Sequence, residues 1–156
     1  MNKKTHIKRL TAHDLPLFQQ LILLFRNVFE MKEDEKAEEH HLKELLEKPG
    51  FIALVITFEN KIAGGLTAYE LPMYYCARKE IYIYDVAIDP AFQRMGLGKQ
   101  ILGWLKEYCV ANNIHEFFVQ AHVEDKHAIN FYHSAGGRAE RVIHFNFNPN
   151  AGNNQH

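Results

Sequence analysis

Segments in which hydrophobic residues recur at helical spacing alternate along the chain with short apolar segments typical of strands. In the first third of the chain, apolar side chains recur at helical spacing after Asp14 and Pro16, which form a capping and entry signal. A charged helical pattern follows and ends at Pro49 and Gly50. The expected helices cover residues 15–29 and 33–48, a segment that begins near 97, and residues 127–135.

Short apolar runs between these helices predict six strands. The first long run is continuously apolar, and Glu59, Asn60 and Lys61 after it predict a hairpin turn. The last run alternates between apolar and polar positions up to the polar tail of the chain. The expected strands cover residues 5–11, 51–58, 62–71, 80–88, 116–123 and 138–148.

The order of these elements predicts an α/β fold. Strands that alternate with helices, around an antiparallel meander in the middle, favour a mixed sheet with helices on both faces. A chain of 156 residues suits a single domain with a substantial core. We expect this domain to cover residues 1–148, followed by a polar, disordered tail over residues 149–156.

Charge and cysteine usage narrow the class of protein. The formal net charge of -1 provides no basic field for nucleic acid or for an anionic membrane surface. The longest apolar runs are too short to span a bilayer, and no apolar stretch of a signal peptide follows the charged N-terminus. Cys76 and Cys109 form no CxxC pair, and a domain of this size needs no disulfide. We therefore expect a cytoplasmic protein.

The stretch QRMGLG, residues 93–98, stands between the expected strand 80–88 and an amphipathic helix. Free N–H groups at a helix N-terminus attract anions, and the two glycines would let a bound group approach the backbone. Gln93 and Gln100 exclude a Walker A loop, and Ile101 excludes a dinucleotide fingerprint. The turn is therefore either a pocket for another kind of phosphate or a helix start in which glycines only turn the chain.

The pattern Gln-x-x-Gly-x-Gly after the strand YIYDVAI resembles the acetyl-CoA motif of the GNAT N-acetyltransferase superfamily. The later stretch AINFYHSAGGRAE is similar to the second motif of that superfamily, a short helix with a tyrosine before a glycine turn. The two motifs lie within residues 80–140. A narrower resemblance, which includes FIALV and GGLTAYELP, is to the aminoglycoside 3-N-acetyltransferases of the gentamicin type.

This resemblance implies the GNAT fold, a mixed and mostly antiparallel central sheet that is splayed and flanked by helices. It also implies that backbone amides of residues 94–99 hold the pyrophosphate of acetyl-CoA, and that the strand before them pairs with the pantetheine arm beside a β-bulge. A buried place in the sheet core is compatible with this role for Val86 and Ile88. The residues expected at the cofactor are Val86, Ala87, Ile88, Gln93, Arg94, Met95, Gly96, Leu97, Gly98, Lys99 and Asn130.

Acetylation of an amine requires two proton transfers, because the ammonium must lose a proton before attack and the leaving thiolate must gain one. Strict alternation places Asp85 on the same face as Ile81 and Ile83, so we expect a partly buried carboxylate with a shifted pKa. Asp85 is a candidate base, with a structural carboxylate as the alternative. Glu80 is a second candidate, with a solvated strand end as the alternative.

Tyr132 stands at the edge of the apolar face of the helix 127–135. From the residues alone it is a core tyrosine, because a buried tyrosine usually finds a structural partner. The resemblance places its hydroxyl near the sulfur of CoA, where it would act as the catalytic acid.

The acceptor side is expected to be acidic. The run EMKEDEKAEEHH is either a solvated helix face or, as the resemblance implies, an acidic wall that attracts a polycationic amine. Asp125 is either a helix cap or a substrate contact. His122 departs from the gentamicin-type pattern, which tends to have an acid there, and it either weakens drug affinity or serves as a base. The expected substrate-binding residues are Asp85, His122, Asp125, Glu33 and Asp34.

These features predict an acetyl-CoA-dependent N-acetyltransferase that acts on a primary amine of a cationic small molecule, an aminoglycoside modified at its 3-N position. The alternatives are a polyamine, another metabolite amine or a protein amine as acceptor, and a regulatory module that binds CoA without turnover. No metal site is expected, because His40 and His41 point to different sides of a helix and HExxH is absent. A homodimer is expected, since similar acetyltransferases often pair through C-terminal strands.

Overall fold

The computed structural model describes residues 4–32 and 36–152, and the chain divides into two compact units, Met1–Gln120 and Ala121–His156. The first unit contains a single five-stranded sheet with the strands in sequence order. Neighbouring strands are antiparallel except for the last pair, which is parallel, so the sheet is mixed and mostly antiparallel as predicted. The strands are β1 (Thr5–Arg9), β2 (Phe51–Phe58), β3 (Lys61–Pro72), β4 (Lys79–Ile88) and β5 (Ile114–Val119).

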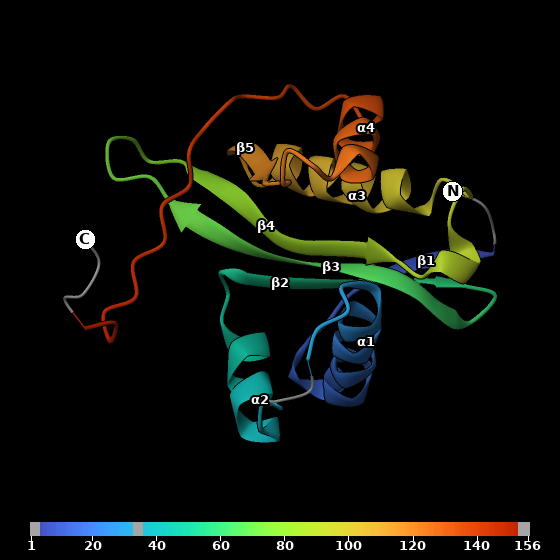
Figure 1. The fold of residues 1–156 in the computed structure, drawn as a ribbon. Helices are drawn as coiled ribbons and strands as arrows, with labels where there is room; N and C mark the ends of the chain where they lie inside the picture. The colour runs from blue at the N-terminus through green and yellow to red at the C-terminus, as the bar shows by residue number, and fades with distance from the viewer. Residues whose placement is uncertain (1–3, 33–35, 153–156) are drawn as a thin grey trace. The chain divides into compact units, whose positions relative to one another are not determined.

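Helices cover both faces of this sheet, which confirms the α/β prediction. Figure 1 shows α1 and α2 on one face and α3 on the other. Two short 3-10 helices, η1 before α1 and η2 after β4, complete the first unit. The bounds are η1 (Ala12–Asp14), α1 (Leu15–Val28), α2 (Glu39–Glu47), η2 (Pro90–Phe92) and α3 (Leu97–Ala111).

Two details of the expected helices are wrong. Residues 36–38 are not helical, so α2 begins only at Glu39, and residues 33–35 lie outside the described chain. Asp14 makes no side-chain capping bond to α1. Its carboxylate instead accepts the N–H of Thr11 at 2.8 Å and pairs with Lys8 at 2.6 Å, because Asp14 closes a capping box around η1.

The expected hairpin joins β2 to β3. Glu59 and Asn60 have φ angles of 47° and 65°, which are typical of the two-residue turns that match the twist of paired strands. The tight turn pairs Thr57 with Ile62, and an extra residue at Ala63 then shifts the register by one, so that Leu54 lies opposite Leu66 and Val55 lies opposite Gly65.

Apolar side chains of the sheet divide between two buried layers. On one face, strand residues such as Ala53, Val55 and Ala87 pack in one cluster with Phe18 and Leu21 of α1. On the other face, α3 buries Leu97, Ile101, Leu102, Leu105 and Cys109 and contacts the four strands β2 to β5.

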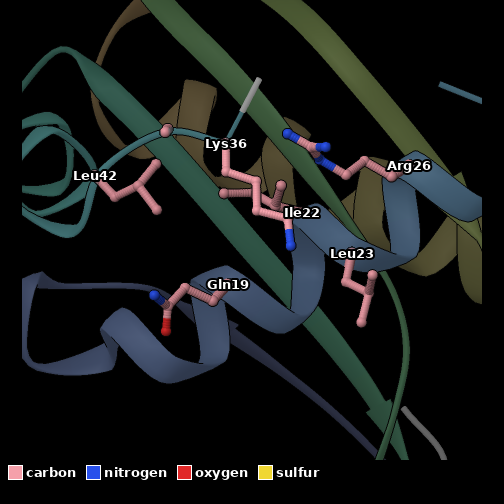
Figure 2. Close-up of a pocket in the computed structure, with 7 residues that line it drawn as sticks. Gln19, Ile22, Leu23, Arg26, Lys36 and Leu42 are labelled. Carbon is pink, nitrogen blue, oxygen red and sulfur yellow. The ribbon is translucent and has the colours of Figure 1, made fainter. Parts of the chain in front are cut away.

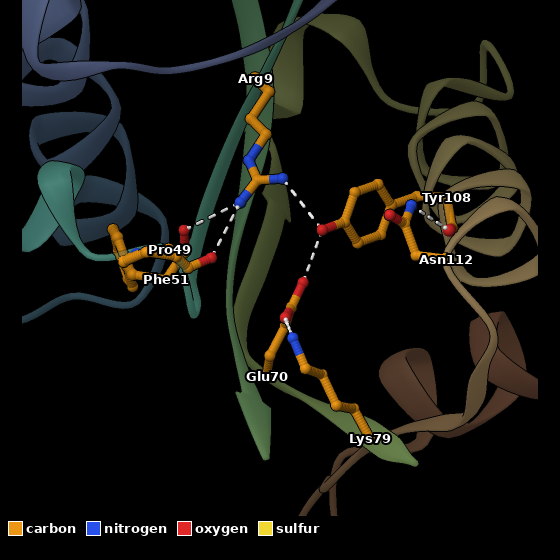
Figure 3. A network of polar contacts seen from close by, with 7 residues as sticks. All are labelled: Arg9, Pro49, Phe51, Glu70, Lys79, Tyr108 and Asn112. Atoms are coloured by element: carbon orange, nitrogen blue, oxygen red, sulfur yellow. Dashed lines mark hydrogen bonds and ion pairs between the residues drawn. The ribbon is translucent and has the colours of Figure 1, made fainter. Parts of the chain in front are cut away.

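A polar network ties the strands to α3 on the second face (Figure 3). The Tyr108 hydroxyl donates to a carboxylate oxygen of Glu70 at 2.5 Å and accepts from Arg9 at 3.1 Å. Lys79 donates to the other oxygen of Glu70 at 2.9 Å. Burial raises the pKa of Glu70, but the bonds from Tyr108 and Lys79 and the nearby positive charges outweigh burial and lower it. The network joins β1, β3 and β4 to the helix that follows the glycine turn.

The second unit contains α4 (Lys126–Ser134), which ends at Gly136 and Gly137 as predicted. Gly136 has a φ of 95°, and the Gly137 N–H donates to the Tyr132 carbonyl at 2.9 Å, so the glycines cap the helix C-terminus. The expected strand 138–148 is wrong, since no strand occurs between α4 and Gly152. A strand exists only where another strand pairs with it. Within the described chain, no helix is both long and apolar enough to cross a membrane.

Candidate active site

β4 carries a bulge at its centre and then separates from β5. Thr67 lies opposite Asp85 whereas Ala68 lies opposite Ile83, so Tyr84 is the extra residue on β4. The pairing with β5 ends at Ile83, and β4 continues alone on that side to residue 88. Within the described part of the sheet, the last residues of β4 therefore have no strand paired on their β5 side and leave a free edge of the sheet there, as expected for a splayed sheet.

The bulge turns Asp85 to the face opposite the one predicted. Ile81 and Ile83 are buried with Ala68 on the α3 face, whereas Asp85 lies beside Thr67 on the face that α1 and α2 cover. The extra residue at Tyr84 shifts the alternation of side chains by one position. The predicted face is thus wrong, but the prediction of a partly buried carboxylate is confirmed.

Asp85 has the electrostatic character of a candidate base. Burial raises its pKa, and no ion pair or hydrogen bond to its side chain occurs in the part of the chain that the structure describes. A half-buried carboxylate without a cation is costly, and its place beside the free edge of β4 makes it available to a cationic ligand.

The three residues after Asp85 form the end of β4. Val86 and Ile88 are half-buried on the α3 face, and Ala87 is buried on the other face. Ala87 and Ile88 lie opposite Gly65 and Gly64, where the missing side chains let the strands and α1 approach closely. The backbone of this segment is thereby held firmly on its β3 side and is free on the other side.

The glycine turn follows η2. The Gln93 side chain donates to the Ile88 carbonyl at 3.1 Å, so it fastens the turn to the end of β4. Arg94 and Gly96 adopt positive φ angles of 63° and 77°, and nothing lies within 4 Å of the place where a Gly96 Cβ would stand. Met95 is 43% exposed. The turn is thus an open backbone surface.

α3 begins directly behind this surface. Leu97 is buried and anchors the first turn of the helix, while Gly98 and Lys99 lie on its more exposed side. Gly96 is the N-cap residue, and no side-chain capping bond occurs among the described residues, so the first N–H groups of α3 suit an anion. Exposed Arg94 and Lys99 add positive charge. The turn therefore fits the pyrophosphate of acetyl-CoA.

Glu80 lies apart from this group of residues. It stands at the start of β4, opposite Leu71 and beside Glu116, five residues before Asp85. Their partners Leu71 and Thr67 are four residues apart on β3, and a strand rises about 3.3 Å per residue, so the backbones of Glu80 and Asp85 are roughly 13 Å apart.

The remaining expected residues belong to the second unit. Asp125 caps α4, because its carboxylate accepts the Ala128 N–H at 3.0 Å, in agreement with the structural alternative. His122 is exposed before this cap. Asn130 is exposed on α4, and Tyr132 is half-buried with its ring 5.3 Å from that of Phe131.

Of the acidic run, Glu33 and Asp34 lie outside the described residues. The neighbouring residues line a cavity of about 260 Å³ between α1 and the segment that leads into α2 (Figure 2). Among the described residues, Arg26 and Lys36 supply the charged groups of this cavity. None of the expected site residues that the structure describes lines this cavity. Its lining consists of Gln19, Ile22, Leu23, Arg26, Lys36, Ala37 and Leu42.

Similarity to known proteins identifies the family to which this site belongs. The sequence model of the acetyltransferase (GNAT) family matches residues 17–136. No curated protein matches the chain. The aminoglycoside acetyltransferase meta-AAC0020, from an uncultured soil metagenomic sample and in complex with sisomicin, is 40% identical with a TM-score of 0.91; the similarity covers 94% of this chain and 97% of that one.

Two further structures are similar. The aminoglycoside acetyltransferase HMB0005, also from an uncultured soil metagenomic sample, is 34% identical with a TM-score of 0.86, over 92% of this chain and 97% of that one. AAC(6')-Iy in complex with the bisubstrate analogue CoA-S-monomethyl-acetylneamine is 15% identical with a TM-score of 0.74, over 92% and 98% of the two chains, and shows a likeness of fold alone.

Proposed function

The chain belongs to the acetyltransferase (GNAT) family and is an acetyl-CoA-dependent N-acetyltransferase; from this premise we propose that its acceptor is an aminoglycoside, modified at the 3-N position. The observation that carries the proposal is Asp85, a half-buried carboxylate with no cation partner among the described residues, at the free edge of β4. Two relatives at 34–40% identity are aminoglycoside acetyltransferases, one of them in complex with sisomicin. The sequence resemblance to the gentamicin type supports the 3-N position.

We propose that Asp85 accepts the proton of the acceptor ammonium. Its raised pKa makes it a stronger base than an exposed aspartate, and among the described residues no cation pairs with its carboxylate. Glu80, near the other end of β4, and His122, exposed in the second unit, are the alternative bases. Acetyl-CoA supplies the activated acetyl group when it is bound.

Four further parts of the chain complete the proposed chemistry. The amides of residues 94–99 bind the pyrophosphate, and Asn130 contacts the pantetheine arm. The free edge of residues 86–88 orients the arm as an added strand would. Tyr132 donates its hydroxyl proton to the leaving thiolate, a role that the family match over residues 17–136 supports.

The acceptor side of the proposed site carries several acids, which neutralise the multiple ammonium groups of an aminoglycoside. Glu33 and Asp34 are proposed to form an acidic wall, and His122 and Asp125 to contact the acceptor from the second unit. A substrate of this kind would make the enzyme a determinant of antibiotic resistance. Free Cys76 and Cys109 are compatible with the reduced cytoplasm, where we place the reaction.

Thiol release from acetyl-CoA tests the proposal. We expect gentamicin, kanamycin or sisomicin to raise the rate far above that with spermidine or a lysine peptide. Fragment mass spectra of the product should place the acetyl group on the 3-amine. A rate that rises with spermidine or the peptide, but with no aminoglycoside, would overturn the acceptor assignment, and an acetyl group elsewhere on the drug would overturn the position.

We propose further that the protein is a homodimer that pairs through its C-terminal segment. The segment alternates in sequence, and Val142, Ile143, Phe145 and Phe147 are 71–89% exposed. Unpaired apolar side chains of this kind favour association with a strand edge. Light scattering should give the mass of a dimer, and Phe145→Glu should shift it to a monomer. A monomeric wild type would contradict the proposal.

A further inference from the structure

Four aromatic rings stand in a row across the sheet, on the face that α1 and α2 cover. Phe51 of β2 lies opposite Tyr69 of β3, with ring centroids 5.3 Å apart. Tyr82 of β4 lies opposite Tyr69 on one side and opposite Phe118 of β5 on the other. The rings of Tyr82 and Phe118 are stacked, with centroids 5.0 Å apart and planes at 20°. The row thus spans four strands.

The bulge adds a fifth ring to this row. The Tyr84 ring meets those of Tyr69 and Tyr82 edge-on, at 5.9 Å and 6.0 Å. At the β2 end, Phe51 is buried and packs against Phe18 of α1. Tyr84 of β4 is 62% exposed, whereas Phe118 of β5 is half-buried. The β2 end of the row therefore belongs to the core, and its open end is at Tyr84.

Asp85 stands directly beside the open end. It follows Tyr84 on the same face and lies opposite Thr67, one row further along the sheet. Burial, and then the nearby Tyr84 and Asp85, raise the pKa of Tyr69. Aromatic faces attract cations and flat apolar surfaces, and a carboxylate attracts an ammonium. The combination suits a rigid ring that carries amines.

We propose that Tyr84, Tyr82 and Phe118 form an aromatic platform on which the ring of a cationic amino sugar stacks while one of its ammonium groups faces Asp85. The inference rests on the function proposed above and deepens it, because it names the residues that select a ring-bearing amine over a linear one. Tyr84 is then a specificity-determining residue. Its ring contributes to acceptor binding and leaves acetyl-CoA binding unaffected.

The test compares three variants with two amines. Tyr84→Leu removes the ring, Tyr84→Phe keeps it, and Tyr74→Leu is the control, because Tyr74 is a 97% exposed tyrosine of the β3–β4 loop whose ring meets that of Tyr75. Calorimetry gives the Kd of sisomicin and of spermidine, and kinetics give KM and kcat. We expect Tyr84→Leu to weaken sisomicin binding about 3- to 30-fold. Tyr84→Phe, Tyr74→Leu and the spermidine Kd should match the wild type.

Several results would overturn the platform. It is overturned if Tyr84→Leu binds sisomicin with the wild-type Kd, or if its affinities for sisomicin and spermidine fall by the same factor. It is also overturned if sisomicin does not bind the wild type. The Kd for acetyl-CoA verifies that Tyr84→Leu is folded, and Phe118→Leu tests the same surface independently. If sisomicin binds in a Tyr84-dependent way but is not acetylated, the proposed function fails and the platform stands. If it is acetylated with a KM that ignores Tyr84, the platform fails and the proposed function stands.

Discussion

Gly64 and Gly65 of β3 point to opposite faces of the sheet and offer a matched pair of substitutions. A Cβ on Gly64 would stand 2.6 Å from Ile88 Cδ1 and 3.0 Å from Ile88 Cα, and closer still to the Ala87 carbonyl. A Cβ on Gly65 would stand 2.5 Å from a backbone oxygen of β2 and 2.9 Å from a methyl of Leu21 in α1. Ordinary contacts begin at 3.4 Å, so either alanine must displace its neighbours by several tenths of an ångström.

The two alanines should cost similar stability but differ in their effect on the site. Overpacking costs about 1–3 kcal/mol, and a domain of this size loses roughly 2–4 °C of Tm per kcal/mol, so we expect each Tm to fall by about 2–12 °C. Gly64→Ala pushes on residues 87 and 88, which lead into the glycine turn. If this backbone must return to its place to bind acetyl-CoA, the same 1–3 kcal/mol raises Kd by about 5- to 150-fold.

Thermal unfolding followed by circular dichroism gives Tm, and titration calorimetry gives the Kd of acetyl-CoA. Gly65→Ala is the control, because its nearest contacts would be with Leu21 of α1 and the Leu54 carbonyl of β2, whereas those of Gly64→Ala would be with residues 87 and 88. We expect its Kd to stay within about twofold of the wild type, a change near RT ln 2. Equal Kd values for the two variants would refute the reasoning that Gly64 sets the position of the cofactor strand.

Three further predictions concern the proposed site. Burial raises the pKa of Asp85, so the folded state disfavours the ionised carboxylate. The wild type should therefore lose stability relative to Asp85→Asn as the pH rises from about 4 through that raised pKa. Urea unfolding at several pH values measures this, and the same pH dependence of the free energy of unfolding in the two proteins would contradict it. Tyr132→Phe should lower kcat more than it raises the Kd of acetyl-CoA, whereas equal changes in steady-state and binding assays would indicate a binding role. Gly96→Val should abolish acetyl-CoA binding in calorimetry, because Gly96 has a φ of 77° and the new side chain would enter the open backbone surface. Gly103→Ala, within α3, is the control and should bind acetyl-CoA as the wild type does.

Regular periods in the sequence were sufficient to predict most of the fold. The apolar periods located α1, α3 and α4 and five strands to within a few residues, because side chains on one face of each element are buried. The helix ends were less predictable. Asp14 reads as a cap for α1, but its carboxylate serves η1, since a capping box depends on a local turn that propensity alone does not reveal.

The segment 138–148 shows a limit of a different kind. Alternation indicates that a segment can form a strand, but a strand also needs a partner edge, and the sequence does not say where that edge lies. Within the described part of the sheet, β5 is an edge strand with β4 as its one neighbour. The alternating and exposed apolar residues of 138–148 are the basis of the dimer proposal.

The glycine turn was predictable because its residues are contiguous, whereas the face of Asp85 was not, because it depends on one inserted residue. The order of apolar residues in β4 does indicate the bulge. The fully buried Ile81 and Ile83 occupy odd positions, whereas the half-buried Val86 and Ile88 occupy even ones. A change of phase inside a strand indicates a bulge. Read in this way, the stretch YIYDVAI predicts that its tyrosine at position 84 and its aspartate leave the α3 face together. The same bulge that frees the backbone for the cofactor thus brings the carboxylate beside the aromatic row, so a deletion of Tyr84 should disrupt both halves of the site at once.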